Sequence, residues 1–230
     1  MNRILLALVA APALVLSTSA TSITAIYGSG NPAEGWTDSV SGELQLALRA
    51  KNRTTGDASN VNGVYTFGSA PAPRGLWNYE FSINSDISGG ETKLTAYDYY
   101  LSIDTDPSQG VTALVVNPLT FWGDNSFGDN STASGAGTEG LALLLAGSNN
   151  LVQNSQNITF IGMPLVDNAT YSFELFATEK GAGINGGRLA EVDITVVVGA
   201  GGASVPDGGA TAVMLGAGLM GLAALRRNKK

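Results

Sequence analysis

The feature that most constrains the fold of this chain is a strict alternation of apolar and polar residues. In residues 77–83, every second residue is aromatic or branched aliphatic, and the residues between them are polar. Successive side chains of a β-strand point to opposite faces, so this pattern predicts a strand with one buried face. The clearest segments of this kind are residues 43–50, 77–83, 171–177 and 192–198.

Weaker strand patterns and turn-rich segments fill the rest of the central region. The weaker strands are predicted at residues 64–67, 94–103, 111–116 and 157–161, and residues 141–146 fit either a strand or a helical turn. Clusters of Gly, Asn, Asp, Ser and Pro separate these segments, and residues 133–140 are predicted to be a mobile loop. We therefore expect an all-β fold over residues 21–198, an antiparallel β-sandwich of jelly-roll-like type.

The amino-terminal residues have the order of a secretory signal. Arg3 precedes an apolar run at residues 4–16, and small residues follow at positions 17–20. A positive end, an apolar segment and a small-residue cleavage site are the three parts of a signal peptide. Residues 1–20 are therefore predicted to be a signal helix that signal peptidase removes after Ala20.

The carboxyl-terminal residues have the order of a membrane anchor. An apolar run at residues 210–225 precedes a basic tail at residues 226–230. As a helix this run would be about 24 Å long, slightly short of the roughly 20 residues of a full span. The basic tail favours the cytoplasmic side of the membrane. We predict a linker at residues 199–209, a transmembrane helix at residues 210–225 and a cytoplasmic tail.

The linker contains a short motif that, with the anchor, resembles a known sorting signal. The motif consists of Val205, Pro206, Asp207, Gly208 and Gly209. With the apolar helix and basic tail, it resembles the PEP-CTERM class, in particular the VPDSG-CTERM variant. Gly208 stands where that variant usually has Ser. The resemblance implies recognition at or near the motif by an exosortase-type processing enzyme, transient anchoring, and transfer to the cell surface or its exopolysaccharide matrix.

The central region is also similar to uncharacterised exported domains that carry such tails. The similarity lies in residues 48–53, 77–82 and 103–107. That group has no assigned activity, so the resemblance adds no catalytic expectation.

Composition excludes several classes of chemistry. The chain has no His and no Cys, which excludes a Ser-His-Asp triad, a thiolate nucleophile and zinc sites built on these residues. A net charge of −7 argues against a nucleic-acid partner. A glycosidase would need two carboxylates that converge on one site. Acids at alternate strand positions also fit a solvent-exposed face, and we favour this second interpretation. The acids considered are Glu80, Asp98, Asp104, Asp106 and Glu174.

Two groups of residues are candidates for binding sites, one for calcium and one for sugars. Asp104 and Asp106 begin a D-x-D loop with oxygen ligands of the kind that calcium prefers, but these residues are also ordinary turn residues, which we favour. Trp36 and Trp122 are predicted to lie in Gly- and Asn-flanked loops and are candidates for stacking on sugar rings, whereas Trp77 is predicted to lie in the core. We therefore expect a non-enzymatic, cofactor-free exported protein with a structural or adhesive role, and a carbohydrate-binding module as the alternative.

Overall fold

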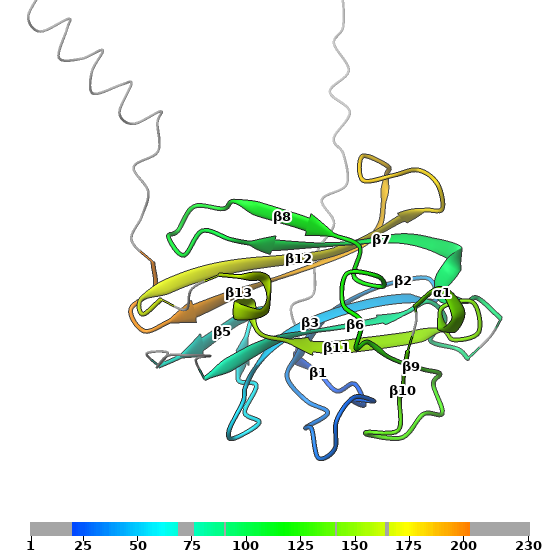
Figure 1. The fold of residues 1–230 in the computed structure, drawn as a ribbon, viewed down its shortest axis with the longest axis horizontal. Helices are drawn as coiled ribbons and strands as arrows, with labels where there is room; N and C mark the ends of the chain where they lie inside the picture. The colour runs from blue at the N-terminus through cyan, green and yellow to red at the C-terminus, as the bar shows by residue number, and fades with distance from the viewer. Residues whose placement is uncertain (1–19, 69–75, 90, 141, 164–165, 203–230) are drawn as a thin grey trace, which may run out of the picture.

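Two β-sheets packed face to face form the folded body of the protein (Figure 1). The structure is a computed structural model that describes residues 20–68, 76–89, 91–140, 142–163 and 166–202. The sheets have seven and six strands within these residues. The predicted all-β sandwich is confirmed, while the predicted signal helix and the predicted transmembrane helix lie outside the described residues, apart from Ala20.

The seven-stranded sheet is antiparallel throughout and forms the lower layer in Figure 1. Its strands, in spatial order, are β1 (Ala20–Thr21), β2 (Trp36–Ser41), β3 (Leu44–Asn52), β6 (Trp77–Asn84), β11 (Leu151–Gln156), β9 (Ser126–Gly128) and β10 (Thr138–Glu139).

The six-stranded sheet is mixed rather than purely antiparallel, because β5 and β13 run parallel. Its strands, in spatial order, are β4 (Asn60–Val61), β5 (Val64–Phe67), β13 (Arg188–Val198), β12 (Ala169–Glu179), β7 (Tyr97–Asp104) and β8 (Ala113–Val116). The helical elements among the described residues are single turns: η1 (Leu94–Ala96), α1 (Ala142–Leu145) and η2 (Ile158–Ile161).

The core lies between the two sheets and is built from the apolar faces that the alternation predicts. Trp77 is buried and contacts Phe67, Tyr171 and Phe173 on the opposite sheet, with ring centroids 5.7–6.2 Å apart. Tyr79 stacks on Phe173 at 4.7 Å. Aromatic contacts of this kind join the sheets with large buried areas, which is the main stabilising contribution in a sandwich.

The structure corrects several strand predictions. The strand expected at residues 157–161 is instead the 3₁₀ turn η2, because the Asn157 side chain accepts a hydrogen bond from the amide of Thr159 and Gly162 ends the turn with φ of 81°. No alternating pattern in the sequence predicts β2 or β11. Of the two alternatives for residues 141–146, the structure has the helical turn, α1.

The loop expected to be mobile is bound to the amino-terminal part of the body. The amide of Gly135 donates to the carbonyl of Ala25 at 3.1 Å, and that of Gly137 donates to the carbonyl of Ile26 at 2.8 Å. Thr138 and Glu139 then form β10. No helix in the described part of the chain is long and apolar enough to cross a membrane.

Candidate functional site

Of the residues of the predicted processing sites, only Ala20 lies in the described part of the chain. The sorting motif, Val205, Pro206, Asp207, Gly208 and Gly209, lies outside the described residues. Ala20, the residue before the predicted signal cleavage, begins β1 and pairs with Thr37. The hydroxyl of Thr21 donates to Asp38 at 2.5 Å, so the first residue expected in the mature chain is attached to the sheet edge.

An irregular segment covers the outer face of the seven-stranded sheet. We call residues 22–35 the N-terminal strap; it is the blue segment below that sheet in Figure 1. The side-chain amide of Gln153 in β11 holds it by accepting from the amide of Ile26 at 2.7 Å and donating to the carbonyl of Thr24 at 3.0 Å. A small apolar cluster under the strap contains Ala25, Tyr27, Trp36 and Ala47.

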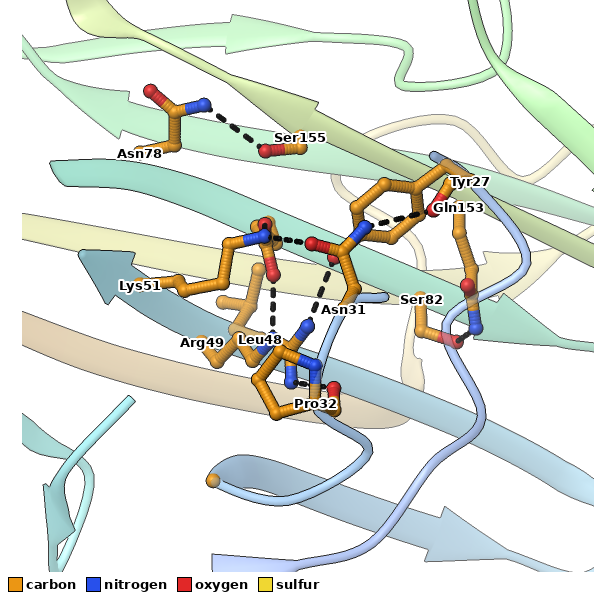
Figure 2. Close-up of polar contacts among 12 residues, drawn as sticks. Tyr27, Asn31, Pro32, Leu48, Arg49, Lys51, Asn78, Ser82, Gln153 and Ser155 are labelled. Carbon is orange, nitrogen blue, oxygen red and sulfur yellow. Dashed lines mark hydrogen bonds and ion pairs between the residues drawn. The ribbon is translucent and has the colours of Figure 1, made fainter. Parts of the chain in front are cut away.

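A buried ionic cluster lies beneath the strap (Figure 2). Arg49 on β3 faces Glu80 on β6, and the guanidinium Nε lies 2.5 Å from the carboxylate. Lys51 Nζ lies 3.0 Å from the other carboxylate oxygen. The side chains of Arg49 and Glu80 are 0% exposed. We call Arg49, Lys51 and Glu80 the charged cluster.

The charged cluster attaches the strap through backbone carbonyls and polar side chains. Arg49 donates to the carbonyls of Pro32 at 2.8 Å and Glu34 at 2.7 Å, and Lys51 donates to the side chain of Asn31 (Figure 2). Arg49 also donates to the hydroxyl of Tyr27 at 3.1 Å. Hydrogen bonds from charged donors are stronger than neutral ones, so the cluster connects the strap firmly to the sheet.

The electrostatics of the charged cluster keep Arg49 and Tyr27 protonated. Burial acts to lower the pKa of Arg49, but the charges of Glu80 and Tyr27 and the hydrogen bonds to both residues together outweigh it, so the pKa is raised overall. Burial, together with the charge of Glu80, raises the pKa of Tyr27 well above its usual value. Neither group is therefore suited to proton transfer near neutral pH. The arrangement is suited to holding the strap.

The carboxylates considered for hydrolysis belong to different parts of the sandwich. Glu80 lies on the seven-stranded sheet beneath the strap, whereas Asp98 and Glu174 lie on the six-stranded sheet. The Asp98 carboxylate is occupied by Lys180 and by the amide of Gly181, each at 2.8 Å, and these hydrogen bonds lower its pKa. The structure therefore does not bring Glu80 together with the acids of the other sheet.

Asp104 and Asp106 serve as turn residues in the structure. Asp104 Oδ1 accepts from the amides of Asp106 at 2.9 Å and Thr112 at 3.0 Å, and Asp106 accepts from the amide of Ser108 at 2.9 Å. These carboxylates thus satisfy the backbone of the β7–β8 connection, as the turn interpretation expects. Within the described residues, no group of three or more acidic side chains is arranged to hold a metal ion.

Trp36, a candidate for sugar stacking, is buried in the structure. The prediction that Trp36 lies in a loop is wrong, because it begins β2 and is 0% exposed. The guanidinium of Arg49 covers its ring at 4.2 Å from the centroid. Trp122 does lie in a loop, but its half-buried ring packs on Phe81 at 5.8 Å and on Tyr79 at 6.2 Å.

The six-stranded sheet carries a second charged and aromatic group on its outer face. Tyr100 stacks on Phe176 at 5.0 Å, and the guanidinium of Arg188 lies 3.3 Å from the centre of the Phe176 ring. Arg188 also pairs with Glu174 at 3.0 Å and Glu191 at 3.3 Å. Burial raises the pKa of Glu174; Arg188 opposes this shift and Glu191 adds to it.

The raised pKa of Glu174 predicts a specific pH dependence of stability. A carboxyl group with a raised pKa binds its proton more tightly in the folded state, so the stability it contributes at low pH is lost as pH rises above its ordinary value of 4.5. Glu174→Gln is expected to reduce this fall in thermal stability between about pH 4 and pH 7. Melting temperatures measured across this range test it, and a slope unchanged from wild type would contradict it.

The last described residues belong to the folded body rather than to a free linker. The amide of Gly199 donates to the carbonyl of Phe67 at 2.9 Å, that of Ala200 to the side chain of Asn168 at 2.9 Å, and that of Gly202 to the hydroxyl of Thr170 at 3.0 Å. The sandwich therefore reaches Gly202, close to the sorting motif. Residues 199–202 are predicted as the start of the linker, but in the structure Gly199 and Gly202 approach neighbouring atoms of the folded body closely.

Comparison with known families identifies a sorting signal in the carboxyl-terminal segment. The chain is an exported protein that carries a PEP-CTERM-type sorting signal. The particular signal is the VPDSG-CTERM motif, which matches residues 204–229.

Other comparisons add little. No curated protein matches the sequence. A solved structure, the N-terminal domain of PorA, aligns with 17% identity over 67% of this chain and 99% of that chain. Its TM-score of 0.27 is too low to indicate a shared fold.

Proposed function

We propose that this protein is a non-enzymatic structural or adhesive component of the cell surface or exopolysaccharide matrix. The observation that carries the proposal is the sorting signal at residues 204–229, which begins directly after a folded body that reaches Gly202. The body is a sandwich whose candidate acids are engaged in ion pairs or turns, which supports a role without catalysis.

The proposed path has two processing steps. Signal peptidase would release the chain after Ala20, leaving Thr21 at the edge of β2. The apolar run at residues 210–225 would then hold the protein transiently in the membrane, with the sandwich outside. An exosortase-type enzyme would recognise the motif near Pro206 and transfer the body to the surface. Pro206 and the two following glycines favour an extended segment of the kind a membrane-embedded enzyme can bind.

Alanine substitution of the motif tests this path. With Pro206→Ala and Asp207→Ala combined, the unprocessed chain is expected to accumulate in the membrane at least about tenfold over wild type, because the enzyme loses its recognition residues. Cell fractionation measures the amount of unprocessed chain in the membrane, and mass spectrometry measures the mass of the form at the surface. Asp193→Asn, which changes an exposed acid on the sandwich, serves as the control and is expected to sort normally. Motif variants that reach the surface with the wild-type mature mass would contradict the proposal.

A further inference from the structure

The segment between the last strand and the sorting motif is docked on the sandwich by specific contacts. We call residues 199–202 the docked tether. Three of its amides donate to groups outside the tether and β13, namely to Phe67, Asn168 and Thr170. The fourth, that of Gly201, closes a turn on the carbonyl of Val198 at 3.0 Å. Every backbone donor of the tether is therefore satisfied by the folded body.

The close contacts of the tether require glycine. A Cβ atom on Gly202 would lie 2.3 Å from the carbonyl oxygen of Pro107, and one on Gly199 would lie 2.6 Å from the side-chain oxygen of Asn168. Gly199 and Gly201 also have φ values of +60° and +80°. Residues other than glycine rarely adopt this left-handed conformation, so the tether has a specific conformation that a flexible linker would not need.

The docked tether leaves little chain between the folded body and the motif. Val205 follows Gly202 by three residues, so their Cα atoms are at most about 10–11 Å apart. Enzymes that process peptide segments commonly bind them in extended form, which requires free backbone on both sides of the recognised residues. With the tether docked, Gly202 is held against Pro107, so Val205 is confined to about 10–11 Å from this end of the sandwich. Release of the four tether residues would add about 13–14 Å.

We propose that the docked tether is a latch that must release from the sandwich before the sorting enzyme can process the motif. The proposal rests on the proposed function, because it concerns the access of that enzyme to residues 205–209. Processing would then be slow while the tether is docked and faster when it is free. The chemistry that holds the latch consists of backbone amides donating to Phe67, Asn168 and Thr170.

Weakening the latch is expected to accelerate processing. Thr170→Val removes the acceptor for Gly202 and keeps the side-chain volume, and the loss of one such hydrogen bond is expected to raise the released population about fivefold. Gly202→Ala introduces the clash with Pro107 and should have a larger effect. Pulse–chase labelling of the full chain in its sorting host measures the rate at which precursor becomes mature protein.

Two controls separate the latch from general destabilisation. Gly187→Ala adds the same methyl group where a Cβ meets nothing within 4 Å, so it should leave the rate unchanged. Insertion of Gly-Ser-Gly-Ser after Gly202 adds reach while the tether stays docked. It should accelerate processing, and Thr170→Val should add little more in that background, because both changes relieve the same constraint.

Hydrogen exchange on the purified full chain measures release directly. Thr170→Val should increase exchange at the Gly202 amide about fivefold, with little change at the amides that pair β12 and β13. If wild-type chain is processed but neither the tether variants nor the insertion change the rate, the latch is wrong. If wild-type chain is not processed at all, the proposed sorting function fails instead, and the exchange result still reports whether the tether is held.

Discussion

Glu80→Gln is expected to lower the free energy of unfolding by about 3–5 kcal/mol, because it leaves two cations buried without a negative partner. The Glu80 and Arg49 side chains are fully buried, and Lys51 is 3.0 Å from the same carboxylate. Glutamine retains the size of the side chain, so the loss reflects charge rather than a cavity. Denaturant unfolding of the purified variant and the wild-type chain measures the difference.

Glu174→Gln is the matched control for this prediction. It makes the same carboxylate-to-amide change in an ion pair whose Arg188 partner is 39% exposed, and solvent screening should limit its effect near neutral pH to less than about 1 kcal/mol. Glu80→Gln should also increase proteolytic cleavage within the strap, because Arg49 and Lys51 attach it to the sheet. Equal small effects for both variants would contradict a stabilising role of the charged cluster.

The sequence predicts those strands whose two faces differ in polarity. β3, β6, β12 and β13 alternate clearly, since one face packs in the core and the other carries polar groups. β11 has no such contrast, because it buries amide side chains. Gln153 binds the strap, and Asn154 and Gln156 each donate to Asp124 at 3.0 Å. A polar side chain that is buried with its hydrogen bonds satisfied looks like a loop residue in the sequence.

The candidate sites differ in whether their residues are contiguous in the sequence. The sorting signal is contiguous, so its order of motif, apolar run and basic tail is visible without a fold. Arg49 and Glu80 are 31 residues apart and meet only through the register of β3 with β6. The sequence alone therefore does not separate Glu80 from acids that lie on other surfaces. Its partner Arg49 lies at a polar position of an alternating strand, where the sequence predicts a solvated side chain.

The strap on the outer face of the seven-stranded sheet also explains why the loop predicted at Trp36 is a buried strand. Its neighbours Glu34, Gly35 and Asp38 are typical of an exposed turn. The strap, however, places an apolar cluster over that face and makes Trp36 part of a second small core. The strap is irregular chain, so no periodic pattern in the sequence indicates that it covers Trp36.

Trp36→Ala is accordingly expected to destabilise the protein by about 3–5 kcal/mol, since it removes a fully buried aromatic side chain and leaves a cavity beneath the strap. The loss includes the contact of the ring with Arg49 at 4.2 Å, which positions a guanidinium that already pairs with Glu80. Thermal and denaturant unfolding measure the change. Phe121→Ala, which removes an aromatic ring that is 46% exposed, should cost less than about 1.5 kcal/mol and is the control.

The same pair of variants distinguishes a structural tryptophan from a sugar-binding one. If Trp36 has only a structural role, Trp36→Ala should bind polysaccharides as strongly as the wild-type chain does. This holds at temperatures where the variant remains folded. Titration followed by tryptophan fluorescence measures this directly. A variant with wild-type stability that had lost polysaccharide binding would show that the ring is reached by ligand, and the strap could then not cover this face as the structure has it.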